Sequence, residues 1–424
     1  MKVKIKKLEG TARQLDIEMP KDVVSKAFEE VLEDIRKTAK IPGFRPGKAP
    51  IDIVRKRFMD DARDEVQRRL IPMGYQMALN DKSITPVSYP EVSEVSLELS
   101  GEFKFTAKVD VEPECDIKKY KGLKVEKEKV VVADEEVKEA LERIRNMHAE
   151  FEKIDRPLGK GDFAICDVET YMDGKPISSK RNNMWIEVDK EVSLLGMGEA
   201  LVGMKPGDKK DINVKLPKDY PDEKYADKDA VFSVEVKDTR EKKVPELDDE
   251  FAKKIGKETS GQVEEEIKGQ LSLRKEANAK VNMKNQIIEQ LIKKHSFDVP
   301  GSMVERQMKV LMDRAENELL QKGVSAEAIG KHKEELNDKL YREAEDKVRV
   351  YFILSRIADC EDIQVEEKEL EDWFASMAMS YNQDVEKVRE YYEKNDLVDG
   401  LKEQLREDKT LEFLLSEAAV TEKA

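Results

Sequence analysis

A long, heavily charged stretch between residues 263 and 294 limits the folds that this chain can adopt. Its apolar side chains recur at helical spacing as a single stripe, formed by Ile267, Leu271, Ala277, Val281, Ile287, Ile288 and Leu291. A helix with one apolar stripe packs on that side and exposes the rest to water. Charged residues make up 40% of the 424 residues and aromatic residues only 6%. The sequence therefore predicts several domains with long helices and modest cores.

The composition also excludes several classes of protein. No apolar run is long enough to span a membrane, and residues 1–7 alternate like an edge strand instead of forming a signal peptide. The three cysteines, Cys115, Cys166 and Cys360, are odd in number and far apart, which predicts neither a disulfide framework nor a zinc site. We therefore expect a cytoplasmic protein without a membrane partner.

No set of residues predicts acid–base or nucleophilic catalysis. His148, His295 and His332 lie in charged, helical stretches and are interpreted as surface histidines. No phosphate-binding loop, dinucleotide fingerprint or hydrolase motif occurs. Asp248 and Asp249 are interpreted as capping residues at a helix start. We expect no cofactor and no metal ion.

Residues 1–112 are predicted to form an α+β domain. Alternating apolar residues indicate two strands at its start and two at its end, with three helical stretches between them. Pro50 suits the first turn of the second helix, and the third carries Val66, Leu70 and Met73. The clearest strand is the last, whose inward face consists of Phe103, Phe105, Ala107, Val109 and Val111.

The remaining chain divides into three parts by its character. Residues 113–156 are predicted to be a connector in which Asp134 caps a helix that continues to Glu150. Residues 157–243 change to short strands and glycine turns around one short helix. Residues 244–424 are predicted to be almost wholly helical. The fold class is therefore a multidomain α+β protein with an all-α C-terminal part.

One loop, residues 41–50, combines two glycines, three prolines and a single aromatic side chain. Phe44 lies at its centre, with Arg45 and Lys48 beside it. Between residues 36 and 58 there are eight basic residues and one acid, although the whole chain has a net charge of -15. Such a positive region predicts a local anionic partner. The alternative is a helix connection with solvated cations.

This loop resembles the signature loop of the bacterial trigger factor family, and the resemblance extends in domain order over essentially the whole chain. The matching residues are Gly43, Phe44, Arg45, Pro46, Gly47 and Lys48, followed by Ala49 and Pro50. The resemblance implies a chaperone that docks at the ribosomal exit tunnel through this loop. It implies a ribosomal protein and rRNA as the docking partners, and nascent and unfolded polypeptides as clients.

Residues 157–243 resemble the FK506-binding-protein (FKBP) type of prolyl isomerase, a bent sheet around one short helix. By this resemblance the positions that would line the catalytic pocket are Val168, Met184, Leu194, Met197, Tyr220 and Phe232. Leu194, Tyr220 and Phe232 match the family pattern, whereas the other three replace aromatic residues. We therefore expect weak peptidyl-prolyl isomerase activity or none. The alternative is that these are ordinary core residues.

Rotation of a prolyl bond is the one reaction that this composition can support without charged catalytic groups. Its barrier of ~18–20 kcal/mol comes from amide resonance, and no covalent bond breaks. An apolar, dry pocket that holds the twisted amide is sufficient to lower that barrier. The FKBP-like segment is where such a pocket is expected.

The helical C-terminal part suggests a different activity, the holding of unfolded segments. The chain contains 16 methionines, several of them between Met303 and Met312 or near Trp373 and Phe374. Flexible thioethers let one surface accept many sequences. The alternative is that these residues form helix-packing cores.

The sequence thus favours an ATP-independent, ribosome-associated chaperone with an isomerase-like middle domain. One rival is an enzyme that is mainly a prolyl isomerase with substrate-binding arms. A second rival is an interaction protein that kept the fold and lost ribosome docking. A homodimer away from the ribosome is an alternative to a monomer.

Overall fold

The computed structural model describes residues 1–45, 47–97, 102–177, 179–188, 197–216, 225, 227–322, 324, 329–330 and 333–423. Contacts divide the chain into two compact units. The first combines Met1–Val125 with Lys284–Ala315 and Lys333–Ala419, and the second is built mainly of Glu126–Met283. No described helix is both long and apolar enough to cross a membrane.

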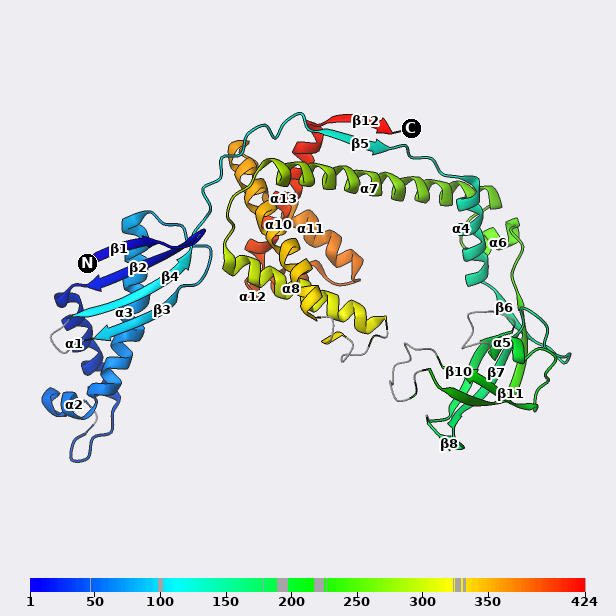
Figure 1. Ribbon diagram of the computed structural model, residues 1–424, viewed down its shortest axis with the longest axis horizontal. Helices are drawn as coiled ribbons and strands as arrows, with labels where there is room; N and C mark the ends of the chain where they lie inside the picture. The colour runs from blue at the N-terminus through cyan, green and yellow to red at the C-terminus, as the bar shows by residue number, and fades with distance from the viewer. Residues whose placement is uncertain are drawn as a thin grey trace. The chain divides into compact units, whose positions relative to one another are not determined.

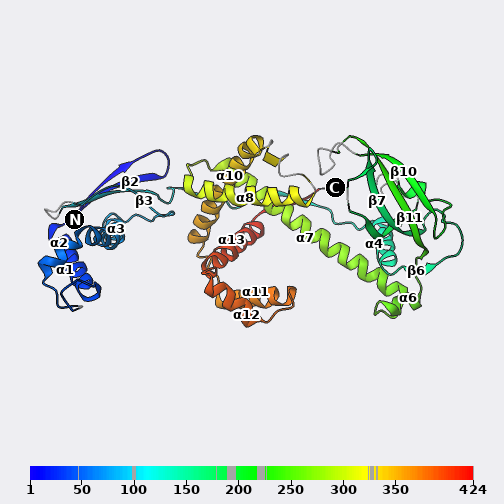
Figure 2. The same cartoon turned by 90° about the horizontal axis from the view of Figure 1, so that it is seen from below.

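The N-terminal domain is a four-stranded antiparallel sheet with helices against it (Figures 1 and 2). The strand order is β1-β2-β4-β3, so the predicted edge strand at the N-terminus is confirmed. The strands are β1 (Lys2–Lys7), β2 (Ala12–Met19), β3 (Glu91–Leu97) and β4 (Phe103–Asp110). The helices are α1 (Lys21–Thr38), α2 (Ile51–Arg57) and α3 (Met59–Lys82). Pro50 is the N-cap of α2, one position before the first turn that the sequence predicts.

The helix α3 packs closely on the sheet through residues at every fourth position. Its buried row contains Val66, Leu70, Gly74 and Ala78, whereas Met73 is exposed. A Cβ atom at position 74 would lie 2.8 Å from the Met19 sulfur and 3.2 Å from the Phe105 ring. Glycine at this position therefore permits the close approach of helix and sheet.

The connector contains β5 (Lys124–Glu128), α4 (Asp134–Met147) and β6 (Glu150–Lys153). Asp134 is not the cap of α4. The N-cap is Ala133, and the carboxylate of Glu136 accepts a hydrogen bond from its N–H at 3.0 Å. The helix also ends before the predicted Glu150, because residues 150–153 pair with a strand of the middle sheet.

The middle domain is an antiparallel sheet with the order β10-β11-β7-β8, in which β6 also pairs with β11 and β9 with β7. Its strands are β7 (Phe163–Met172), β8 (Lys175–Pro176), β9 (Arg181–Glu187), β10 (Lys209–Lys215) and β11 (Asp229–Lys243). Asp173 and Gly174 have φ of 50° and 73°, as a two-residue hairpin turn requires. The short helix α5 (Met197–Ala200) packs against the sheet.

The helix α6 (Asp249–Lys254) begins as the sequence predicts. The Asp248 side chain accepts a hydrogen bond from the N–H of Phe251 at 2.8 Å, which confirms its capping role. Phe251 is 2% exposed, and its neighbour Ala252 packs with Leu141 of α4.

The 35-residue helix α7 (Ser260–Lys294) is confirmed, but its buried face differs from the predicted stripe. Ala277 is exposed and Val281 is 54% exposed. The buried residues recur at intervals of four or multiples of four, and they are Val263, Ile267, Ala279, Met283, Ile287 and Leu291. At about 100° per residue, each four-residue step turns the face by about 40°. The buried face therefore winds around α7.

The helical part continues with five further helices that the structure describes. They are α8 (Gly301–Gln321), α10 (Lys333–Cys360), α11 (Glu367–Ser380), α12 (Val385–Lys394) and α13 (Val398–Ser416). One apolar core joins α8 to α10, and a second joins α11, α12 and α13. The strand β12 (Ala419–Lys423) then pairs with β5, so this last segment is not helical.

Candidate functional site

The loop between α1 and α2 is anchored at both ends (Figure 1). Ile41 and Ala49 are 6% and 4% exposed and belong to the core of the N-terminal domain. The N–H of Gly47 donates to the carbonyl of Arg36 at 3.0 Å, and the N–H of Phe44 donates to the carbonyl of Ile41 at 3.0 Å. The first of these hydrogen bonds ties the loop to the last turn of α1, and the second closes a turn within the loop.

Two glycines allow the chain to turn within this loop. Gly43 has φ of +87° and Gly47 has φ of +81°, in the left-handed region that costs other residues energy. An added Cβ would meet no atom within 4 Å at either position. Backbone conformation, and not lack of space, is therefore the reason for glycine at both positions.

The tip of the loop presents one aromatic ring and two free cations. Phe44 is 39% exposed, and Arg45 and Lys48 are exposed. Neither cation forms an ion pair with any residue that the structure describes. Pro46 lies outside the described residues. The tip can therefore contact a partner without first breaking an internal interaction.

The middle domain brings together the four described residues of the predicted isomerase pocket. Val168 of β7, Met197 of α5 and Phe232 of β11 are 3%, 0% and 7% exposed, and Met184 of β9 is half-buried beside them. All four belong to one apolar cluster. Such burial is also what an ordinary hydrophobic core shows, so the role of these residues as a pocket stays a prediction.

Two of the predicted pocket residues, Leu194 and Tyr220, lie outside the described residues. Tyr225, which the sequence does not predict as a pocket residue, is half-buried and packs against the same cluster. In the sequence it is marked only as a second tyrosine, five positions after Tyr220.

Cys166 also lies in this apolar cluster, where it is 0% exposed. Burial raises the pKa of its thiol to about 12, and the nearby Asp167 carboxylate contributes in the same direction. A thiol that stays protonated at neutral pH is a poor nucleophile. Cys166 is therefore interpreted as a core residue and not as a nucleophile.

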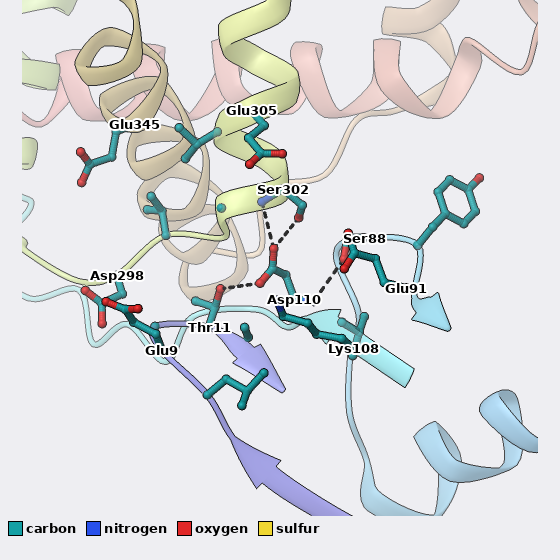
Figure 3. Close-up of a pocket in the computed structure, with 18 of the residues that line it drawn as sticks. Glu9, Thr11, Ser88, Glu91, Lys108, Asp110, Asp298, Ser302, Glu305 and Glu345 are labelled. Atoms are coloured by element: carbon teal, nitrogen blue, oxygen red, sulfur yellow. Dashed lines mark hydrogen bonds between the residues drawn. The ribbon is translucent and has the colours of Figure 1, made fainter. Parts of the chain in front are cut away.

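A polar cavity of about 700 Å³ lies where the N-terminal domain meets α8 (Figure 3). The carboxylate of Asp110 accepts hydrogen bonds from the N–H and the hydroxyl of Ser302, at 3.0 and 2.5 Å, and from the hydroxyl of Thr11 at 3.4 Å. The N–H of Asp110 donates to the Ser88 hydroxyl at 3.1 Å. Asp110 therefore caps the first turn of α8 from a strand of another domain.

The sequence alone does not predict this contact between Asp110 and Ser302, because the two residues lie 192 positions apart along the chain. The cavity is also lined by Glu9, Glu91, Asp298, Glu305 and Glu345. No cluster of His, Cys, Asp and Glu in the described part of the chain is suited to hold a metal ion.

The helical part contains a larger cleft, of about 1110 Å³, between α7, α8, α10 and α13. Its apolar lining includes Ile288, Ile292, Met303, Val348, Val350 and Tyr351, and charged side chains line it as well. Among the other predicted client-binding residues, Met312 and Phe374 are buried in cores, whereas Met379 is 87% exposed. A cleft lined by both apolar and charged side chains can hold an extended, partly apolar peptide segment.

Comparison with known proteins covers the same three regions. The sequence-family model of the bacterial trigger factor protein matches residues 1–144, and the family model of the trigger factor C-terminus matches residues 261–416. Between them, the model of the FKBP-type peptidyl-prolyl cis-trans isomerase matches residues 155–237.

Relatives match the chain over its full length. The trigger factor of Geotalea daltonii is 33% identical, with 100% of this chain and 98% of the relative covered. The trigger factor of Geobacillus sp. strain WCH70 is also 33% identical, with 99% and 100% covered. A solved structure of the trigger factor chaperone has a TM-score of 0.50 at 22% identity, covering 98% of this chain and 100% of that one, which supports the fold. The chain therefore belongs to the bacterial trigger factor family of ribosome-associated chaperones, with an FKBP-type middle domain.

Proposed function

We propose that this protein docks at the ribosomal exit tunnel through residues 43–48 and holds nascent chains there without ATP. The loop carries this proposal: its ends are buried, its glycines fix the turns, and Phe44, Arg45 and Lys48 are exposed. The cations suit rRNA and acidic side chains of a ribosomal protein, and the ring suits an apolar pocket on that protein. The place of action would be the cytoplasm.

Co-sedimentation with ribosomes tests the docking proposal. We expect the variant Phe44→Ala/Arg45→Ala/Lys48→Ala to lose most of its binding and to keep the wild-type melting temperature. Binding of the wild type should weaken as salt rises, because cations contribute to it. A matched control, Tyr89→Ala/Lys4→Ala/Lys26→Ala, removes one exposed aromatic residue and two exposed cations elsewhere in the same domain. Equal binding of the loop variant and the control would refute the assignment.

We further propose that the middle domain binds prolyl peptides at the apolar cluster around Phe232 and isomerises them weakly. Aliphatic and thioether side chains at positions 168, 184 and 197 give a softer wall than aromatic rings would. Turnover of a proline peptide by the full-length protein tests this. Phe232→Leu should lower the rate of isomerisation. The control is Trp185→Phe, which should leave the rate unchanged, because Trp185 follows Met184 in β9 and therefore lies on the opposite face of the strand. A fast wild-type rate would favour the rival function of a dedicated isomerase.

We propose that clients bind in the helical cleft, and the apolar lining residues Ile288, Met303 and Tyr351 support this placement. Cross-linking from Met303 to a ribosome-bound nascent chain would support this placement. Homodimerisation of the free protein remains a prediction, and sedimentation velocity would test it through the measured mass.

A further inference from the structure

Three consecutive cations at the end of α2 are not used by the docking loop. Arg55, Lys56 and Arg57 are all exposed, and none of them forms an ion pair with a described residue. In α1, by contrast, Arg36 pairs with Glu33 and Lys37 pairs with Asp34. Between residues 36 and 58, the cations without an ion pair to a described residue therefore lie after the end of α1, on the loop and on α2.

The lack of pairing in α2 is not caused by a lack of acids nearby. Asp52 lies on the same helix, and Asp60 and Asp61 lie in the first turn of α3, where the helix dipole favours negative charge. One or two cations in the last turn would be sufficient to offset the dipole of a helix with 7 residues. Three unpaired cations keep a high local potential on a chain whose net charge is -15.

The surface of α2 is continuous with the docking loop. Pro50, the last loop residue, is the N-cap of α2, and a 7-residue helix is only about 10 Å long. Val54, which is 0% exposed, fixes the helix on the domain core and so fixes the position of the cations. Whatever the loop contacts, the end of α2 therefore lies close to it.

We propose that Arg55, Lys56 and Arg57 bind phosphates of ribosomal RNA beside the contact of the loop. This inference rests on the proposed docking function. RNA is the occupant that fits best, because successive helical residues point about 100° apart and a phosphate backbone offers a charge at every nucleotide. Arginine in particular binds phosphate with two parallel hydrogen bonds.

The salt dependence of ribosome binding separates this role from a structural one. The test variant is Arg55→Gln/Lys56→Gln/Arg57→Gln, and the matched control is Lys4→Gln/Lys7→Gln/Lys26→Gln. The control lysines are exposed, belong to the same domain and also form no ion pair with described residues. At roughly 0.7 to 0.9 per phosphate contact, the slope of log affinity against log salt should become shallower by about 2 to 3 in the test variant only. Affinity near 0.1 M salt should fall at least roughly tenfold.

Each outcome has a distinct meaning. If the loop variant loses binding and the α2 variant keeps the wild-type slope, the inference about α2 is wrong and the docking proposal stands. If the loop variant binds normally, the docking proposal fails, whatever α2 does. A photo-cross-linking residue in place of Lys56 gives an independent readout on ribosomes. A ribonuclease-sensitive adduct supports the inference, and an adduct to ribosomal protein alone overturns it.

Discussion

At the scale of single residues, Glu407 in the helical cleft has a raised pKa. Burial raises the pKa of its carboxyl to about 7, and the negative charges of Asp408 and Glu403 contribute in the same direction. An unfolded glutamate has a pKa of about 4.3. Between about pH 4.3 and pH 7 the folded state therefore keeps a proton that the unfolded state has released. The contribution of Glu407 to stability therefore falls as the pH rises through this window.

The substitution Glu407→Gln tests this sign. A neutral amide removes the cost of the buried charge, so the variant should melt at a higher temperature than the wild type at pH 8. At about pH 4.5 the two proteins should melt alike, because the wild-type carboxyl is protonated there. Thermal denaturation at both pH values measures the difference, with the exposed Glu393→Gln as control. The same shift at both pH values would contradict the assigned cause.

The glycines of the docking loop give a second prediction at this scale. Alanine at Gly43 and Gly47 must adopt a positive φ, which costs roughly 1–2 kcal/mol at each position. We expect the loop to rearrange instead, so that Gly43→Ala/Gly47→Ala binds ribosomes more weakly while the domain stays folded. Gly269→Ala is the control, because Gly269 lies inside α7 with open space around it. Its substitution should raise stability slightly and leave ribosome binding unchanged.

At the scale of elements, the sequence predicts best where a signal is local. The strand with Phe103 and Phe105 alternates strictly, and the Asp248 cap lies three residues from the N–H that it binds, so both are confirmed. The cap at Asp134 was wrong because Ala133 adopts the extended capping conformation and Glu136 reaches back to it.

The buried face of α7 shows why other features could not be predicted. Ala277 and Val281 fit an apolar stripe in the sequence but are exposed. One end of α7 packs on α4 and α6, whereas near the other end Lys284 pairs with Glu412 of α13 at 3.5 Å. A helix that changes partners must rotate its buried face, and a single sequence does not name the partners. In the middle domain, by contrast, the sequence predicts that four of the described residues lie together, and they do share one apolar cluster. The function of this cluster as a pocket stays a prediction.

The Asp110 cap on α8 yields a prediction for an element. Asp110→Ala removes the acceptor for the N–H of Ser302, and loss of such a cap costs about 1 kcal/mol. We expect faster hydrogen exchange in the first turns of α8 and a lower melting temperature. Asp298→Ala is the control. The carboxylate of Asp298 lines the same cavity but has no hydrogen-bond partner among the described residues, so its removal should change neither the hydrogen exchange nor the melting temperature. Unchanged exchange in Asp110→Ala would show that the cap contributes nothing.

At the scale of the whole molecule, the chain has separate cores in its two units. The sequence predicts the order of the parts from shifts in composition. It does not predict that the first unit joins residues before 125 to residues after 284, because those contacts are long-range. Separate cores predict more than one unfolding transition.

Two matched substitutions test the independence of the cores. Ile17→Val in the N-terminal domain and Ile186→Val in the middle domain each remove one methylene group from a site that is 2% and 1% exposed. Each should cost about 1 kcal/mol. Scanning calorimetry should show Ile17→Val lowering one transition and Ile186→Val lowering another. A shift of all transitions by either variant would mean that the two cores unfold together.

The composition of the first unit also has a consequence for biosynthesis. The N-terminal domain has a core of its own between Val3 and Val111, but α8 shares its core with α10, which the translating ribosome delivers later. The middle domain, whose strands pair with one another in a single sheet, can fold long before then. During its own translation, therefore, the apolar face that α8 shares with α10 stays uncovered until α10 emerges, in the same condition as the nascent chains that the protein is proposed to protect.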